Sequence, residues 1–411
     1  MVKRRLPLNP SLEQLKNQAR DLLEAYVSGD DTAVVDFQAF HPRGVTRDVA
    51  KLTDAQLVLA RTYDFQSWPC LRLGAELSRA ISNDALEEIR RLVTEHPELL
   101  VEQVRGEDSS WGPPLSFAAN LGKQPVIDLL IELGADDVQF AFSRAVLQGK
   151  IDVARRFTEM GARPERGMVM LPCETVSGDG LAFLVEELGA DLVDGDGNPL
   201  EPLRMVFETY SRNPEGKHRC LEVFERSGAD LPDTAPMAFH RGRLDLLESC
   251  LNRDAGLLER RFSYEEIYPY SHKGQTGLHG TPLNGATLLH MAVDFDELEI
   301  FEWLLEKGAN PDIAAEVDGD GFGGHTPLFN TVVSQAVTCG RQKDARMARV
   351  LLAQGADPAA RASLRKALRY EDDGSEHVYR DVTPLEWGER FHGRRWVNER
   401  AMQAIRESGG Q

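Results

Sequence analysis

Three side chains around one glycine-rich stretch have the types needed for acid–base or metal chemistry. The stretch DGDGFGGHTPLF runs from Asp318 to Phe329, and His325 stands directly before its Thr-Pro pair. Imidazole changes charge near neutral pH, and a neighbouring carboxylate can orient it or share in proton transfer. Together with His279, Asp318 and His325 are therefore the candidate catalytic groups, acting either as general acid and base or as metal ligands.

The spacing of these groups matches no familiar metal site. No H-x-x-x-H or H-E-x-x-H segment of the kind that places zinc ligands on one helix face supports them. Asp194 and Asp318 each begin an Asp-Gly-Asp-Gly segment, but neither segment has the glutamate that an EF-hand needs at position twelve. We interpret both as acidic turns. Because phosphate-binding glycine loops and G-x-S-x-G motifs are also absent, we expect no metal and no cofactor.

The composition is that of an ordinary globular protein and argues against several classes of function. Of the 411 residues, 42% are hydrophobic and 27% charged, and the formal net charge is −19. A field of that sign repels nucleic acid, and without a run of about 18 apolar residues no membrane span is expected. The five cysteines include no CxxC pair, which argues against a disulfide framework. With no apolar signal segment at the start, the expected location is the cytoplasm.

The elements that must hold the candidate groups recur along the chain. In the clearest unit, from Gly285 to Ile313, the apolar residues fall into two short helical patterns, and Gly308 then supplies a left-handed stop. The same Gly-Ala ending follows other apolar helices at Gly134, Gly161, Gly189, Gly228 and Gly355. Related openings recur as PPLSFAA, HTPLFNT and VTPLEWG.

These openings and endings resemble the ankyrin repeat, over about residues 81–410. The resemblance implies an all-α solenoid of helix-turn-helix units with β-hairpin fingers, in which neighbouring units bury one another's apolar faces. It also implies that Thr and Pro open each first helix, as cap and first-turn residue. His290 takes the place of the family's buried histidine, which forms hydrogen bonds between repeats.

The match divides the chain into three predicted parts. Residues 81–284 are degenerate ankyrin-like repeats, and residues 285–411 are well-matched repeats with a C-terminal cap and extended fingers. Residues 1–80 do not fit the repeat. Their segments PSLEQLKNQARDLL and DAQLVLARTYDFQSWP resemble a helical block found ahead of repeats in many bacterial ankyrin proteins. We favour an N-terminal helical cap domain over a separate partner-docking domain for this block.

Three consecutive fingers are predicted to be enlarged, at residues 257–284, 311–324 and 358–381. Loops on a rigid scaffold are where binding residues concentrate. The candidate binding residues in or beside these fingers are Tyr264, Tyr268, Tyr270, His272, Asp320 and His325. Those predicted at the exposed ends of the first helices, on the concave face that ankyrin proteins use for binding, are His240, Arg241, Asp294, Phe295, Val333, Ser334, Arg390 and Phe391.

Two functions remain open at this stage. The first is a cytoplasmic binding module that recognises a protein partner through its concave face and the three fingers, and the net negative charge favours a partner with a basic patch. Tyr268, Tyr270 and Phe295 are its expected apolar anchors. The alternative is an enzyme or small-ligand binder with a pocket beneath the fingers, using His279, Asp318 and His325. Interaction is favoured, because the resemblance is to a family dominated by interaction scaffolds.

Overall fold

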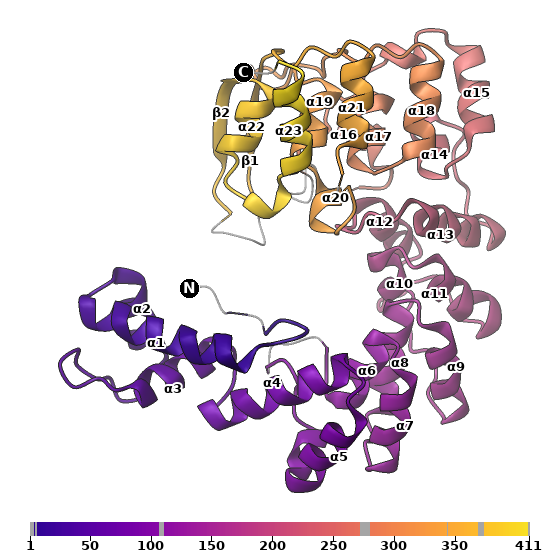
Figure 1. Ribbon diagram of the computed structural model, residues 1–411. Coiled ribbons are helices and arrows are strands. Elements are labelled where there is room, and N and C mark those ends of the chain that lie inside the picture. The colour runs from indigo at the N-terminus through magenta and orange to yellow at the C-terminus, as the bar shows by residue number, and fades with distance from the viewer. Residues whose placement is uncertain are drawn as a thin grey trace. The chain divides into compact units, whose positions relative to one another are not determined.

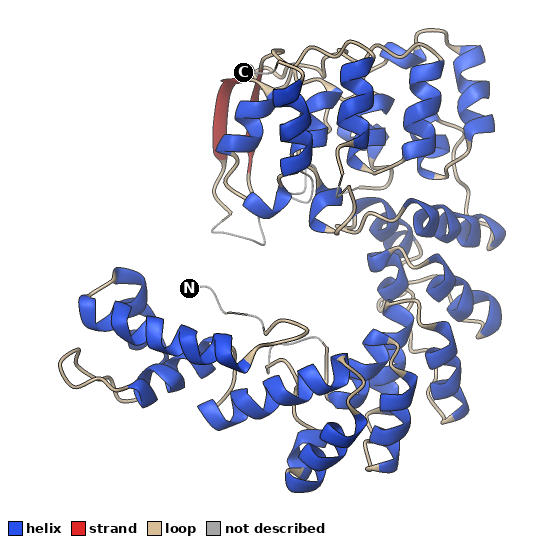
Figure 2. Cartoon of the chain, viewed as in Figure 1, coloured by secondary structure: helices blue, strands red, loops and turns tan. Residues whose placement is uncertain are grey.

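A computed structural model describes residues 4, 6–106, 111–271, 280–342, 344–368 and 374–409. In this part of the chain the structure is mostly α-helical, with one two-stranded sheet (Figure 2). The chain divides into two compact units, residues 1–163 and 164–411. The predicted domain boundaries at residues 80 and 284 fall inside these units and stay predictions.

The first unit begins with a helical block that has its own apolar core. Its predicted first helix is confirmed: Leu15, Ala19, Leu22 and Tyr26 lie buried on one face, and the Tyr26 ring stacks on Phe37 with centroids 3.7 Å apart. The described elements of this unit are α1 (Leu12–Ser28), α2 (Asp31–Phe40), α3 (Leu52–Thr62), α4 (Trp68–Ser82), α5 (Leu86–Glu95), η1 (Pro97–Leu100), α6 (Pro114–Leu121), α7 (Gln124–Glu132), α8 (Val138–Leu147) and α9 (Ile151–Glu159).

The second unit holds the remaining elements, all of which Figure 1 shows in sequence colours. Its first part contains α10 (Met170–Thr175), α11 (Gly178–Ala182), η2 (Phe183–Glu187), α12 (Leu200–Glu208), α13 (Pro214–Arg226), α14 (Ala235–His240), α15 (Leu244–Arg253), η3 (Leu257–Glu259) and α16 (Tyr264–Ile267). Its second part contains α17 (Leu288–Asp294), α18 (Leu298–Glu306), α19 (Pro327–Val332), α20 (Gln335–Thr338), α21 (Arg346–Ala353), β1 (Ala362–Lys366), β2 (His377–Val382), α22 (Pro384–Arg390), η4 (Arg394–Trp396) and α23 (Glu399–Glu407).

Pairs of helices repeat through the second unit. Helix α14 packs on α15, α17 on α18, α19 on α21, and α22 on α23, while α17 also packs on α19 and α19 on α22 (Figure 1). Each pair therefore covers apolar surface of the next. The predicted left-handed stops are confirmed, because positive φ angles are found at Gly134, Gly161, Gly189, Gly228, Gly308 and Gly355.

The threonines that open the first helices cap them at some positions and not at others. Thr383 accepts from the Glu386 amide, and Glu386 in turn accepts from the Thr383 amide, which makes a capping box. Thr287 shares a similar arrangement with His290. Thr326 makes no side-chain cap hydrogen bond, so the predicted capping role is wrong at that position.

The three enlarged fingers take different forms. The third is the predicted β-hairpin: β1 and β2 pair antiparallel, with Leu364 opposite Tyr379. The middle finger has an antiparallel bridge between Val317 and Gly323, and Gly323 also bridges Ser363 of the third finger. The first finger is closed at its base by an antiparallel bridge between Phe262 and Ala286, and residues 264–267 form α16 in place of a strand. A helix forms there because Ser263 and Glu266 make a capping box at its start.

Both Asp-Gly-Asp-Gly segments are tight turns of the same design, which confirms their interpretation as acidic turns. Oδ1 of Asp194 accepts from the amides of Asp196 and Asn198, at 3.0 and 2.8 Å. Oδ1 of Asp318 accepts in the same way from Asp320 and Phe322, at 3.0 and 2.9 Å. One carboxylate oxygen of each first aspartate thus accepts hydrogen bonds from backbone amides of its own turn.

Gly323→Ala is expected to lower the free energy of unfolding by roughly 1–3 kcal/mol, as estimated for a residue forced into a disfavoured conformation. Gly323 has φ +121°, and a Cβ there would lie 2.0 Å from the carbonyl oxygen of Glu316. Gly319→Ala in the same finger is the matched control, because a Cβ there meets nothing within 4 Å. Urea unfolding of both variants checks this, and equal stabilities would contradict it.

Candidate functional site

Most residues predicted to line an open concave face are buried, so that part of the sequence interpretation is wrong. The exposed fractions are 0% for His240, Asp294, Val333 and Ser334, 3% for Phe295 and 2% for Phe391. The two tyrosines expected as anchors differ in exposure. Tyr268 is fully buried, whereas Tyr270 is partly exposed. The Tyr270 hydroxyl donates to the Asp230 carbonyl. The physical reason is that other segments of the chain cover the ends of these helices.

Arg212, from the loop between α12 and α13, covers the end of α17. Its Nη2 lies 3.0 Å from Oδ2 of Asp294, and the two side chains are 1% and 0% exposed. Its Nε also donates to the backbone carbonyl of Asp294 at 3.2 Å, where the negative end of the helix dipole favours a cation. The guanidinium lies 4.4 Å from the centre of the Phe295 ring. Sequence reasoning missed Arg212, which lies far from α17 along the chain.

A second buried pair lies beside the first. Nζ of Lys217, in α13, is 2.8 Å from Oε1 of Glu297, which His218 also approaches at 3.1 Å. Burial disfavours the charged form of both partners. It lowers the pKa of Lys217. In Glu297 burial would raise the pKa, but the charges of Lys217 and His218 outweigh it, so the pKa of Glu297 is lowered. The two groups are thus held as a close buried pair. Lys217 also lies 4.4 Å from the Phe295 ring centre.

His240 is held neutral inside this cluster. Burial, and then the charge of Lys217, lower the pKa of His240 well below its ordinary value. Its Nε2 donates to the Ile267 carbonyl at 2.7 Å, which leaves Nδ1 to accept from Lys217 at 3.4 Å. The ring packs edge-on against Phe295, with centroids 5.0 Å apart. Burial also raises the pKa of Tyr268 well above its ordinary value, so neither group is a charged contact for a partner.

Lys366 is a further buried lysine, and the charges of Asp294 and Arg212 act on it. It lies at the end of β1 with 8% of its surface exposed, on the face of the strand that also buries Ala362 and Leu364. Burial lowers the pKa of Lys366 to about 8; the nearby charge of Asp294 opposes this effect and that of Arg212 adds to it. A lysine in phase with buried apolar residues was the sequence signal for this position.

The three candidate catalytic groups are only partly described. His279, like the predicted binding residue His272, lies outside the described residues. Asp318 and His325 both line a cavity of about 230 Å³, together with Arg365. Asp318 is 2.8 Å from Arg365, and its backbone hydrogen bonds, with a smaller contribution from that arginine, lower its pKa. Within the described residues no group of three or more metal-ligating side chains is found.

His325 lies in the interior, and its described contacts are structural. It is 1% exposed, and its Nε2 donates to the Pro282 carbonyl at 2.9 Å. Burial lowers the pKa of His325 to about 4. The predicted role of His290 is confirmed, because its Nε2 donates to the His325 carbonyl at 3.0 Å and so links two successive helix pairs. Burial lowers the pKa of His290 to about 3.

The remaining predicted residues at helix ends have local roles. Val333 forms an isolated bridge with Val397, and Ser334 caps α20 by accepting from the Ala336 amide. Phe391 packs on Trp387, with ring centroids 4.8 Å apart. Two predicted residues keep accessible polar groups, Asp320, which pairs with Arg365, and Arg390. The side chain of Arg241 is only 8% exposed and pairs with Glu225.

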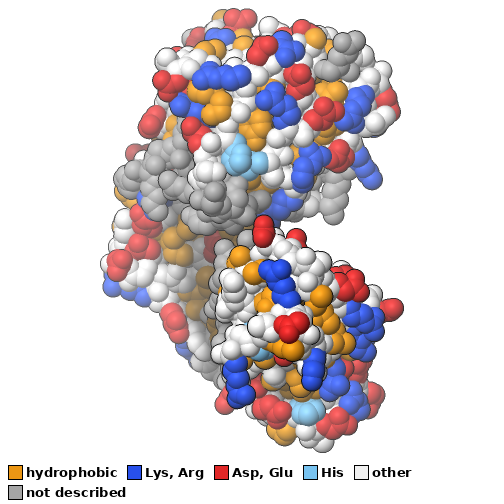
Figure 3. Space-filling view, turned by 90° about the vertical axis from the view of Figure 1, so that its left-hand side faces the viewer, with side chains coloured by type: hydrophobic (Ala, Val, Ile, Leu, Met, Phe, Trp, Pro, Cys, Tyr) orange, Lys and Arg blue, Asp and Glu red, His pale blue; other side chains and the backbone are white. Residues whose placement is uncertain are grey.

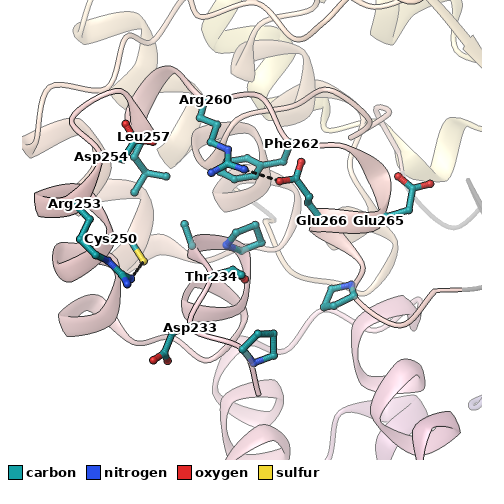
Figure 4. Close-up of a pocket in the computed structure, with 14 residues that line it drawn as sticks. Asp233, Thr234, Cys250, Arg253, Asp254, Leu257, Arg260, Phe262, Glu265 and Glu266 are labelled. Atoms are coloured by element: carbon teal, nitrogen blue, oxygen red, sulfur yellow. Dashed lines mark hydrogen bonds and ion pairs between the residues drawn. The ribbon is translucent and has the colours of Figure 1, made fainter. Parts of the chain in front are cut away.

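An open groove of about 370 Å³ lies at the base of the first finger (Figure 4). Its apolar part comes from Leu257 and Phe262, both buried, and from Ala235 and Pro236 at the start of α14. Pro269, just after α16, closes one side. Helix α16 and the start of α14 thus provide walls in place of the predicted hairpin.

Charged side chains surround this groove and leave it acidic. Four carboxylates, from Asp233, Asp254, Glu265 and Glu266, face two guanidiniums, from Arg253 and Arg260. Figure 4 shows Arg260 joined to Glu266, an ion pair of 2.7 Å, and Arg253 near Cys250. Within the described residues Asp233 and Glu265 have no cationic partner.

A larger groove of about 680 Å³ has charges that are mostly paired within the chain. Arg341 binds Asp296 at 2.8 Å, and Arg346 binds Glu302 at 2.6 Å. Across the face drawn in Figure 3, acidic and basic side chains are likewise interspersed. The larger groove also keeps Glu299 and Asp344 without an ion pair among the described residues, so the smaller groove differs in joining such carboxylates to an apolar floor.

Comparison with known proteins identifies one ankyrin repeat. Residues 284–316 match the family model "Ankyrin repeat", whereas no curated protein matches the chain. Among solved structures, the human ASB11 ankyrin repeat domain is 17% identical, with 72% of this chain and 98% of that chain covered and a TM-score of 0.22. The ankyrin repeat domain of Bcl-3, a member of the IkappaB family, is 19% identical, with 71% and 97% covered and a TM-score of 0.23. Scores this low decide nothing about this chain.

Proposed function

We propose that the protein is a cytoplasmic interaction module that binds a segment of a partner protein in the acidic groove beside α16. Ankyrin repeats are in general protein–protein interaction modules, and fold alone does not name the partner. The observation that carries the proposal is the groove itself, an apolar floor with carboxylates left unpaired at its edge. Five free thiols accord with a reducing compartment. No described helix has the length and apolar character to cross a bilayer.

The chemistry of the groove specifies the partner segment. Above the buried Leu257 and Phe262, Pro232 and Pro269 keep part of their surface exposed and offer an apolar contact for one side chain, and burying such a side chain contributes roughly 1.5–3 kcal/mol. Asp233 and Glu265 favour lysine or arginine on either side of it. Charge complementarity of this kind sets specificity and association rate more than affinity. The expected ligand is therefore an extended segment with an apolar residue flanked by basic ones.

Selection from a random peptide library on the immobilised full chain is expected to enrich an apolar residue next to Lys or Arg. The double variant Asp233→Lys, Glu265→Lys is expected to weaken binding of a selected peptide at least about tenfold, which corresponds to ~1.4 kcal/mol. The double variant Glu306→Lys, Glu407→Lys, an equal charge change at exposed positions of α18 and α23, is the control and should bind as the parent does. Fluorescence anisotropy measures all three.

Two outcomes would count against the proposal. Selected peptides without enrichment of basic residues would remove the charge argument. Equal binding by the parent and the double variant would place the docking surface outside the groove. Affinity should also fall as salt is raised, because the exposed carboxylates are screened over about 8 Å at physiological ionic strength.

A further inference from the structure

A small cavity of about 230 Å³ lies where the middle and third fingers meet. Its walls come from the loop before α17, from the middle finger and from β1. Backbone hydrogen bonds join these three segments. The Gly323 amide donates to the Ser363 carbonyl at 2.7 Å, and the Glu316 amide donates to the Gly285 carbonyl at 2.8 Å. The fold itself therefore holds the walls of the cavity in place.

One wall of the cavity is apolar. It is made by Phe322 and Leu364, which are 9% and 1% exposed. The guanidiniums of Arg365 and Arg380 lie 4.7 and 3.7 Å from the centre of the Phe322 ring, and such cation–π contacts favour one position of the ring. This wall can pack against the hydrocarbon part of a small ligand.

The two carboxylates that line the cavity differ in their partners. Asp318 is bound to Arg365 at 2.8 Å, and Arg365 also lies 3.1 Å from Asp320. The side chain of Glu316, by contrast, is exposed and forms no hydrogen bond or ion pair with any described residue. One carboxylate of the cavity is therefore available to a cation that enters it.

The lining also includes a buried acceptor that lacks a donor. His325 is 1% exposed, and its Nε2 donates to the Pro282 carbonyl at 2.9 Å. Because the ring is neutral, its Nδ1 then carries a lone pair, and no described residue donates to that nitrogen. A buried acceptor without a donor costs free energy, which a hydrogen bond from a ligand would recover.

We propose that this cavity binds a primary ammonium group on a short apolar stem, the chemistry shared by small alkylamines and by lysine side chains. The ammonium forms an ion pair with Glu316 and donates a second of its three N–H bonds to Nδ1 of His325. The stem packs on Phe322 and Leu364. Among the described residues none lines both this cavity and the groove beside α16, so the site is independent of the proposed partner groove.

Isothermal titration calorimetry of the full chain with n-butylamine at pH 7, where an alkylamine is protonated, tests the proposal. n-Butanol has the stem without the charge, and butyltrimethylammonium has the charge without N–H donors. n-Butylamine is expected to bind at least about tenfold more tightly than either, because it alone supplies charged hydrogen bonds. Absence of n-butylamine binding would overturn the proposal. Equal binding of the two cations would also overturn it, since the net charge of the protein would then explain the effect.

The source of the amine is distinguished by N-acetyl-lysine methylamide, which presents a lysine side chain as a peptide does. Affinity similar to that of n-butylamine would assign the cavity to lysine side chains. Affinity at least about tenfold weaker would mean that the added backbone does not fit and would assign it to free amines.

Glu316→Gln removes the charge of the cavity and keeps the size of the side chain. It is expected to weaken n-butylamine binding at least about tenfold. Because the Glu316 side chain is exposed, the urea midpoint should not change, which separates lost binding from lost folding. Glu306→Gln, at an exposed position of α18, is the matched control and should bind as the parent does. Equal binding by the Glu316→Gln variant and the parent would place the amine outside this cavity and overturn the proposal.

Discussion

Replacing Arg212 by methionine is expected to lower the free energy of unfolding of the second unit by roughly 3–5 kcal/mol, since one partner of a buried ion pair is left behind. The pair measures 3.0 Å, and neither side chain is more than 1% exposed. Without Arg212, the Asp294 carboxylate and its backbone carbonyl each lose a hydrogen bond. Hydrogen exchange of α17 amides in increasing urea reports this unit separately from the first.

The matched control is an arginine whose ion pair is exposed. Arg346 lies 2.6 Å from Glu302, with side chains 55% and 44% exposed, and such pairs contribute about 0–1 kcal/mol. Arg346→Met should therefore change little. Combining Arg212→Met with Asp294→Asn should recover part of the loss, because the stranded charge is removed. A loss below about 1 kcal/mol in Arg212→Met would mean that water reaches the pair.

The elements of the fold were predictable where the signal is local. Periodic apolar residues gave the helices, and the Gly-Ala endings required a positive φ that only glycine adopts without cost. The role of His290 followed from the resemblance of its segment to a repeat, and it is confirmed. Asp194 and Asp318 were correctly read as turn residues, because the missing glutamate of a calcium loop can be seen in the sequence alone.

The site was less predictable, because exposure depends on segments that are distant in the chain. The alignment placed Asp294 and Phe295 at a helix end, but it could not show that Arg212, 82 residues earlier, covers them. The first finger likewise carries a helix, since its capping box outweighs the hairpin expected from the family pattern. The groove beside α16 depends on both the covered helix ends and the helix in the first finger. No single sequence motif predicts it.

The buried cluster around Arg212 and Asp294 and the groove beside α16 have different roles in the second unit. Buried ion pairs add little net stability over apolar packing, but they penalise arrangements in which either partner is stranded. We infer that Arg212 and Asp294 fix where the loop before α13 lies, and so keep the ends of the first helices closed. In the proposed function, a partner would then bind in the outer groove, where carboxylates are accessible, instead of on the concave face.

Lowering the pH from 7 to 5.5 is expected to cost the second unit roughly 4 kcal/mol of stability, from three buried histidines at about 1.2 kcal/mol each. Burial lowers the pKa of His290 to about 3 and that of His325 to about 4, and it lowers the pKa of His240 well below its ordinary value. In the unfolded chain each ring has a pKa near 6.5. As the pH falls through that value, the unfolded state binds protons that the native state excludes.

The sign follows from this difference in proton uptake. A group whose folded pKa is depressed contributes no penalty above its unfolded pKa and an increasing one below it, until the folded pKa is reached. For these histidines the window runs from about pH 6.5 down toward the folded values. Glu297 adds a loss of the same sign, but only below its unfolded value of 4.5. Between pH 6 and 5 the slope of the unfolding free energy against pH should approach that of three protons. Each proton corresponds to about 1.4 kcal/mol per pH unit.

Urea unfolding at a series of pH values, read by hydrogen exchange in α14, α17 and α19, measures this slope. His325→Gln should reduce it by about one proton, because that ring is 1% exposed and Nδ1 has no partner among the described residues to stabilise an added charge. His96→Gln is the control, since His96 lies 36% exposed beside Glu98 and should leave the slope unchanged. A slope below one proton in the parent would mean that the three rings accept protons in the folded state, and the structural assignment of His325 would then give way to an acid–base role.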